Sequence, residues 1–306
     1  MHTYSIDFIS RFRGTGVALV TPFSDDDAID FSALDTLIDH CINGGVEYLV
    51  SMGTTGESAT LSEEERFDII AHTIRKVQKR VPVVAGFGGN NTAEIIRSLE
   101  RYTEKFSGSD TFADAILIAS PYYNKPSQEG IYQHYMAIDA ASPLPIILYN
   151  VPGRTASNME AKTTLRIAQD AQHVIAIKEA SGNFAQCMQI IRDAPKNFIV
   201  LSGDDPITLP FIATGMQGVI SVVANAWPAQ FSGMVRDSLA GNFAKALPAH
   251  LDLLHITELL FKEGSPAGVK AALHAMGICG EKVRLPLWNI SDALRTEIIH
   301  EVKRLG

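Results

Sequence analysis

Short runs of apolar residues alternate along the chain with longer amphipathic stretches. The apolar runs are rich in Val, Ile, Leu and Ala and show no strict alternation of apolar and polar positions, which is typical of parallel strands covered on both faces. We predict strands at residues 16–23, 48–52, 82–87, 115–120, 145–150, 174–180, 198–203 and 218–225. Because a potential helix follows each run, the order favours strands joined by crossover helices.

The clearest predicted helix begins after residue 62. Ser62 and Glu65 have the spacing of a capping box, in which the two side chains satisfy backbone N–H groups at the helix start. Apolar residues then recur at helical spacing, at Phe67, Ile70, Ala71, Ile74 and Val77. Eight such strand–helix units predict a (β/α)8 TIM barrel rather than a doubly wound sheet.

The strand pattern stops near residue 240. The remaining chain predicts three further helices, at residues 243–262, 266–277 and 291–304. We therefore divide the chain into a catalytic barrel at residues 1–240 and a helical extension at residues 241–306 that packs on the barrel.

Composition predicts an ordinary globular protein. Hydrophobic residues make up 46% and charged residues 20%, and the net charge is -8, which disfavours nucleic acid as a partner. The chain contains no run of 18 apolar residues, so we predict no membrane span. The first residues lack the apolar core of a signal peptide. The three cysteines are far apart and never in CxxC spacing. We therefore expect no disulfide framework and no metal site, in a cytoplasmic protein.

Polar motifs follow several of the predicted strands. Barrel enzymes hold their active residues at the carboxyl ends of the strands and in the loops that follow them. Such motifs are GTTGES at 53–58, YNVPGRT at 149–155, KEASG at 178–182 and SGDD at 202–205. Because the two carboxylates of SGDD would repel phosphate, we do not expect a phosphorylated sugar as substrate.

Lys178 ends the sixth apolar run and allows two interpretations. A lysine at a strand end usually lays its stem along apolar surface and places its charge in water. Alternatively, burial disfavours the charged form, and the neutral amine can form a Schiff base with a ketone. Its neighbour Glu179 points to the opposite face of the strand. Periodicity alone does not show which of the two faces the barrel interior.

Other polar residues at these strand ends are equally ambiguous when each is taken alone. Thr54 and Thr55 could bind a small carboxylate through hydroxyls and oriented amides, or could only cap a helix. Arg154 offers a planar fork for carboxylates, and Tyr149 could relay protons, but a surface arginine and a core tyrosine fit as well. Glu57 could be a catalytic acid or could accept hydrogen bonds from backbone N–H groups.

Six motifs occur together in one order: GTTGESATL, PYYNKPSQEGIYQH, YNVPGRT, IKEASGN, LSGDD and GVISV. Over about residues 14–300 they resemble the dihydrodipicolinate synthase family. The resemblance implies a class I aldolase-type lyase that condenses pyruvate with L-aspartate 4-semialdehyde, in diaminopimelate and lysine biosynthesis. The products would be 4-hydroxy-tetrahydrodipicolinate and water. It implies no organic cofactor or metal, because a lysine serves as the electron sink.

The same resemblance implies four catalytic residues. Lys178 would form the Schiff base with pyruvate, and Tyr149, Thr54 and Tyr123 would relay protons. In the family, the position matching Tyr123 reaches into the active site of the neighbouring subunit. At least a homodimer is therefore expected, and the family pattern suggests a homotetramer built as a dimer of dimers.

Substrate-binding residues are implied in the same way. Thr55 would hold the pyruvate carboxylate, and Arg154 would bind the carboxylate of aspartate semialdehyde at the mouth of the site. Gly203 and Ile220 match backbone positions near the lysine.

Some members of the family are inhibited by lysine, which binds at the dimer interface. The positions that match this pocket are Ser58, Ala59, Asn90, Glu94 and Tyr122. However, Glu63 and Arg66 stand where sensitive members often have histidines, so the response to lysine is left open. The segment EGSPAGVK at 263–270 keeps a Pro and a Lys but lacks the usual Asn before the Pro.

Three other functions are compatible with parts of the pattern. Another pyruvate-Schiff-base lyase, such as N-acetylneuraminate lyase or a keto-deoxy-sugar-acid aldolase or dehydratase, would share Lys178 and Tyr149, but Arg154 favours a second substrate with its own carboxylate. A non-catalytic keto-acid sensor would have no need of the intact set of reactive residues. A retaining glycosidase would need Glu57 and Glu179 to face one cleft.

Overall fold

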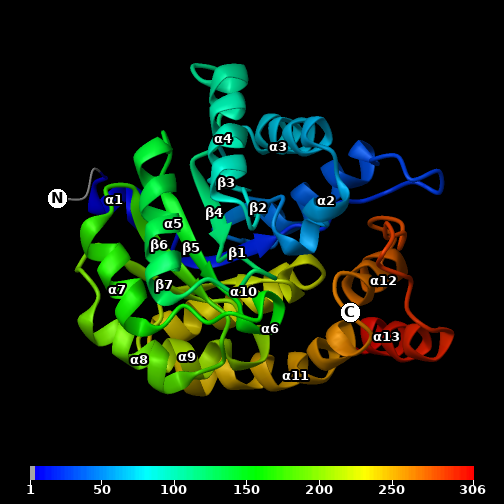
Figure 1. Cartoon of the computed structure of the whole chain (residues 1–306). Coiled ribbons are helices and arrows are strands. Elements are labelled where there is room, and N and C mark those ends of the chain that lie inside the picture. Colours follow the sequence, from blue (N-terminus) through cyan, green and yellow to red (C-terminus); the bar gives the residue numbers. More distant parts are fainter. Residues whose placement is uncertain (1–3) are drawn as a thin grey trace.

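Eight parallel strands close into a barrel in the order of the sequence in the computed structural model, which describes residues 4–306 (Figure 1). The strands are β1 Gly14–Ala18, β2 Tyr48–Ser51, β3 Val83–Gly86, β4 Ala115–Ala119, β5 Ile146–Asn150, β6 Val174–Glu179, β7 Ile199–Ser202 and β8 Gly218–Ser221. All eight predicted strands are present, and the predicted TIM barrel is confirmed.

Helices surround the barrel or lie at its ends. They are α1 Ile6–Ser10, α2 Phe31–Asn43, α3 Glu63–Val77, α4 Thr92–Phe106, α5 Gln128–Ala141, α6 Pro152–Thr155, α7 Ala161–Asp170, α8 Phe184–Asp193, α9 Thr208–Ala213 and α10 Pro228–Leu239. The predicted capping box of α3 is present, since Ser62 and Glu65 each accept a hydrogen bond from the other's backbone N–H. Short 3-10 turns at Thr54–Gly56, Ser58–Thr60, Asp205–Ile207 and Val223–Asn225 follow three of the strands.

Successive side chains along each strand pack in two separate cores. One core fills the barrel, and the other lies between the strands and the helices around them. On β6, Ala176 belongs to the inner core and Ile177 to the outer one. Because side chains alternate along a strand, Lys178 faces the barrel interior. At the amino end, Phe12 packs edge-on against Tyr48, with ring centroids 5.8 Å apart, and helps to fill the barrel there.

Three further helices follow the barrel: α11 Phe243–Lys262, α12 Ala267–Ala275 and α13 Asp292–Leu305. They confirm the predicted helical extension, and Figure 1 shows them in orange and red on one side of the barrel. The hydrophobic core outside the strands continues into this extension, through residues such as Leu253 and Leu260. The division of the chain at residue 240 stays a prediction. Among the described residues, none of the helices has the length and apolar character needed to cross a membrane.

Candidate active site

The side chain of Lys178 points into a cavity at the carboxyl end of the barrel. Only 5% of the residue is exposed. In the sheet, Lys178 is paired with Tyr149 of β5, and its Nζ lies 4.3 Å from the centre of the Tyr149 ring. The lysine therefore does not carry its charge out to water, and the interpretation of Lys178 as a solvated strand end is wrong.

Glu179 points the other way and is fully buried outside the barrel. Its carboxylate accepts hydrogen bonds from Nδ2 of Asn150 at 3.1 Å, from Nε2 of Gln186 at 3.1 Å and from the N–H of Ser181 at 2.8 Å. These bonds hold the loop after β6 and leave the carboxylate no route to the cavity. Glu57 and Glu179 therefore do not face one cleft, as a retaining glycosidase would require.

The cavity around Lys178 has a volume of about 520 Å3. Six of the eight predicted catalytic and substrate-binding residues line it: Thr54, Thr55, Tyr149, Arg154, Lys178 and Gly203. These residues come from four different strand ends, so closure of the barrel brings them together. The other two lie elsewhere: Ile220 is buried in the core of the barrel, and Tyr123 is 87% exposed on the loop after β4.

Because Gly203 has no side chain, the aliphatic stem of Lys178 can pack directly against it. A Cβ built on this residue would lie 2.7 Å from Cβ of Ala180, 2.9 Å from Cε of Lys178 and 3.1 Å from its Cγ. All three distances are below ordinary van der Waals contact. A side chain at this position would therefore push the lysine stem away from its place beside Tyr149.

Replacing Gly203 with alanine is therefore expected to slow formation of a pyruvate adduct about tenfold, because small displacements of a reacting group cost large factors in rate. The measurement is the rate at which borohydride traps pyruvate on the protein. Gly233→Ala is the matched control, because a Cβ at Gly233 meets no atom within 4 Å, and its rate should equal that of the parent. An unchanged rate in Gly203→Ala would show that the lysine does not need this space.

Thr54 and Thr55 lie in a 3-10 turn directly after β2. Thr55 is buried and Thr54 is exposed, yet both line the cavity. The turn ends at Glu57, whose φ of 55° places it in the left-handed region. Glu57 is not a free acid: its Oε1 accepts from Nζ of Lys270 at 2.5 Å, and its Oε2 accepts from the N–H of Arg284 at 3.0 Å. The second alternative for Glu57, as an acceptor of backbone N–H groups, therefore holds for Oε2 and the N–H of Arg284, whereas the ion pair with Lys270 was not expected.

Two carboxylates form an acidic wall of the cavity after β7. Oδ2 of Asp205 accepts hydrogen bonds from the N–H groups of Val222 at 2.9 Å and Val223 at 3.2 Å. Burial raises the pKa of Asp205, and burial together with the nearby Asp205 raises the pKa of Asp204. Such a wall disfavours a phosphorylated substrate, as expected from the sequence. Among residues 4–306, no three His, Cys, Asp or Glu side chains are grouped so that they could hold a metal ion.

Arg154 stands at the mouth of the cavity in the short helix α6. Its side chain is exposed, and none of the described residues forms a hydrogen bond or an ion pair with the guanidinium. A guanidinium without a carboxylate of its own can bind the carboxylate of a ligand through two parallel N–H···O bonds.

The residues of the predicted lysine pocket surround two adjoining cavities. Ser58 and Ala59 line a cavity of about 520 Å3, whereas Asn90 and Glu94 line one of about 230 Å3. Tyr122 lines both. Arg66 also lines both cavities, and Glu63 lines the smaller one, where Arg101 holds it with two hydrogen bonds of 2.6 and 2.8 Å and lowers its pKa.

One side of the active-site cavity could not be predicted from the strand ends. Thr257, Glu258 and Phe261 of α11 line it, although α11 belongs to the helical extension. The strand-end rule searches only the loops that follow the strands, and the sequence of α11 gives no other signal. The amphipathic pattern of α11 shows that one face is buried, but not against which part of the barrel.

Comparison with known proteins identifies close relatives along nearly the whole chain. A model of the dihydrodipicolinate synthetase family matches residues 11–305. The chain is 51% identical over 277 residues to 4-hydroxy-tetrahydrodipicolinate synthase of Parabacteroides distasonis, an alignment that covers 90% of this chain and 91% of that protein. It is 48% identical to 4-hydroxy-tetrahydrodipicolinate synthase of Flavobacterium psychrophilum, over 97% of this chain and 100% of that protein.

A solved structure agrees with these sequence relatives. The chloride-inhibited dihydrodipicolinate synthase of Acinetobacter baumannii, determined as a complex with pyruvate, has a TM-score of 0.90 and 37% sequence identity. The match covers 95% of this chain and 98% of that chain. The whole barrel and the helical extension are therefore shared.

Proposed function

The chain belongs to the dihydrodipicolinate synthetase family, and on that premise we propose how its residues carry out the reaction. The activity is that of a 4-hydroxy-tetrahydrodipicolinate synthase in lysine biosynthesis. The substrates are pyruvate and L-aspartate 4-semialdehyde, and Lys178 is the residue that binds pyruvate covalently. The observation that carries this proposal is the buried Nζ of Lys178, 4.3 Å from the ring of Tyr149 in a cavity that Thr55 and Arg154 also line.

Pyruvate reacts first. The neutral amine of Lys178 attacks the ketone carbon, and the ketone oxygen takes up protons and leaves as water, so that an imine joins Lys178 to the substrate. The hydroxyl of Thr55 and the N–H groups of its turn bind the pyruvate carboxylate. Tyr149 and Thr54, together with Tyr123 of the partner subunit, pass the protons. The relative from Acinetobacter baumannii, solved with pyruvate, supports pyruvate as the ligand of this cavity.

Carbon–carbon bond formation follows. Loss of a proton from the methyl carbon of the imine gives an enamine, and its nucleophilic carbon attacks the aldehyde of aspartate semialdehyde. Arg154 holds the carboxylate of that substrate at the mouth. The amino group of the new chain then attacks the imine carbon, which closes the ring and releases Lys178 as a free amine. One water is released over the whole reaction.

The active unit in this proposal is at least a dimer. Tyr123 is an aromatic residue that is 87% exposed in the single chain, and its φ of 71° is rare for a residue other than glycine. We propose that it inserts into the active site of a second copy, within a homotetramer. The lysine pocket formed by Ser58, Ala59, Asn90, Glu94 and Tyr122 stays a prediction. A cytoplasmic location is also a proposal, supported by three cysteines that are free and buried.

Trapping with borohydride tests the central step. In the presence of pyruvate, reduction should attach one pyruvate-derived group to the protein, and peptide mass spectrometry should place it on Lys178. An adduct on another lysine, or none, would refute the proposed role. A coupled assay then compares second substrates: turnover with N-acetylmannosamine but not with aspartate semialdehyde would favour the other lyases that share this lysine.

A further inference from the structure

We propose that the buried ion pair between Glu57 and Lys270 is a positioning device that clamps the turn of Thr54 and Thr55 onto the helical extension. The inference rests on the proposed function, because it concerns the turn that binds pyruvate. Glu57 and Lys270 do not touch the substrate in this proposal. They act by holding the two threonines in place.

The pair closes a long-range contact between the two parts of the chain. Both side chains are fully buried, with exposed fractions of 0%. Lys270 lies in α12 and donates one hydrogen bond to Oε1 of Glu57 at 2.5 Å and another to the backbone oxygen of Lys282 at 2.7 Å. Its ammonium also lies 4.3 Å from the centre of the Phe23 ring. The lysine therefore joins the loop after β2, the loop after β1 and the helical extension.

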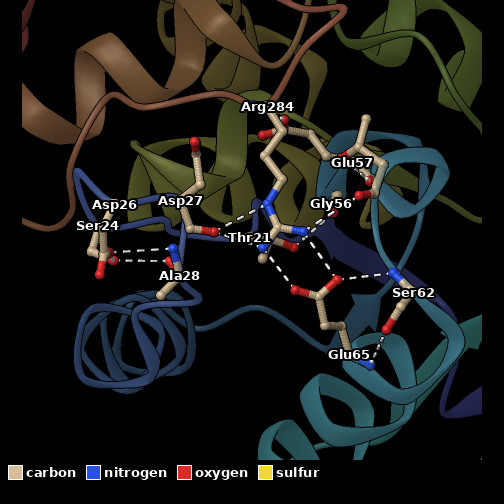
Figure 2. Close-up of polar contacts among 11 residues, drawn as sticks. Thr21, Ser24, Asp26, Asp27, Ala28, Gly56, Glu57, Ser62, Glu65 and Arg284 are labelled. Atoms are coloured by element: carbon tan, nitrogen blue, oxygen red, sulfur yellow. Dashed lines mark hydrogen bonds and ion pairs between the residues drawn. The ribbon is translucent and has the colours of Figure 1, made fainter.

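The second oxygen of Glu57 continues the clamp through Arg284. The N–H of Arg284 donates to Oε2 of Glu57, while its guanidinium donates to both oxygens of Glu65, at 2.7 and 3.0 Å (Figure 2). The guanidinium also donates to the backbone oxygen of Asp27 at 2.6 Å. The hydrogen bonds from Arg284 lower the pKa of Glu65, whose carboxylate accepts the N–H of Ser62 in the capping box of α3. Arg284 of the extension thus binds both Glu57, within the loop after β2, and Glu65, in the helix that follows this loop.

A displacement of Glu57 would also move Thr54 and Thr55, because the three residues belong to the same turn. The N–H of Glu57 donates to the carbonyl of Thr54 at 3.1 Å, and the N–H of Gly56 donates to the carbonyl of Gly53 at 3.1 Å. On the other side, Oγ1 of Thr21 donates to the carbonyl of Gly56 at 2.7 Å. Glu57 also keeps a left-handed backbone conformation that non-glycine residues rarely adopt without support.

Stability alone gives a poor account of this pair. Two charges removed from water lose hydration, and apolar residues of the same volume often serve as well or better. A buried carboxylate tied at both oxygens does, however, fix a loop in one geometry. Active-site groups need such support from behind if they are to stay within fractions of an ångström of their working positions.

The test separates positioning from stability with Lys270→Met and the double variant Glu57→Gln/Lys270→Met. Lys270→Met leaves a carboxylate buried without its cation and should lower the melting temperature, whereas the double variant removes both charges and should recover most of that loss. In both variants the pyruvate concentration that half-saturates adduct formation should rise about tenfold. The half-saturating concentration of aspartate semialdehyde should stay within about twofold, because Arg154 lies outside the clamp.

Arg295→Gln is the matched control. Arg295 of α13 forms ion pairs with Asp292 of the same helix and with Glu281, and among the described residues none of its hydrogen bonds or ion pairs reaches the loop after β2. It should lower the melting temperature without changing half-saturation by pyruvate. Two results would refute the positioning role. In the first, the half-saturating concentration of pyruvate rises in proportion to the loss of melting temperature in all three variants. In the second, it returns to the parent value in the double variant. If the parent protein forms no adduct on Lys178, the proposed function is wrong. If the parent and the variants all form the adduct at the same pyruvate concentrations, only the positioning role is wrong.

Discussion

Lys178→Ala is expected to form no pyruvate adduct under borohydride and to lose about 1,000-fold or more in kcat, while its melting temperature stays close to that of the parent. The loss follows from the geometry, because among residues 4–306 no other lysine lines the cavity. Without its amine, neither the imine nor the enamine can form. Steady-state kinetics with both substrates, together with adduct mapping by mass spectrometry, provide the measurement.

Two further variants make that result specific. Lys178→Arg keeps a long cationic side chain in the cavity but cannot supply a neutral amine, so it should be as inactive as the alanine variant. Lys162→Ala removes an exposed lysine from α7 and should retain full activity. An adduct that persists in Lys178→Ala, on whichever lysine it is mapped, would contradict the proposed chemistry.

The apolar pattern predicted the barrel because its strands are covered on both faces. Burial also explains why the predicted end of the last strand was wrong. The last predicted strand ran to residue 225, but β8 ends at Ser221 and a 3-10 turn follows. The residues of that turn are as buried as those of the strand. The backbone there finds partners outside the sheet, because Asp205 accepts the N–H groups of Val222 and Val223, and Ser221 accepts that of Ala224. Apolar composition reports burial, and here burial continues past the end of the sheet.

The strand-end rule found much of the site, and its limits are physical. A period of two shows that Lys178 and Glu179 face opposite ways, but only the closed barrel shows which one faces inside. The contact between Glu57 and Lys270 joins residues 213 positions apart, and no local pattern encodes it. Motif resemblance supplied the proposed roles of residues, whereas the contacts behind these residues became visible only in three dimensions.

Arg154→Ala is expected to raise the half-saturating concentration of aspartate semialdehyde about 30-fold, because a charge-assisted hydrogen-bonded pair contributes about 2 kcal/mol. Formation of the pyruvate adduct should stay within about twofold of the parent, since the imine forms deeper in the cavity at Lys178. Initial rates with each substrate varied in turn, and trapping with pyruvate alone, separate the two effects. Loss of the adduct in this variant would show that Arg154 serves pyruvate instead.

Arg154→Lys sharpens the same prediction. Lysine keeps the charge but loses the planar fork, so half-saturation by the aldehyde should fall between the parent and the alanine variant. A value equal to the parent would mean that charge alone attracts the substrate, and one equal to alanine would mean that the two parallel hydrogen bonds carry all the affinity. Because no carboxylate of the described chain pairs with Arg154, these differences report binding of the substrate, without a contribution from breaking an internal ion pair.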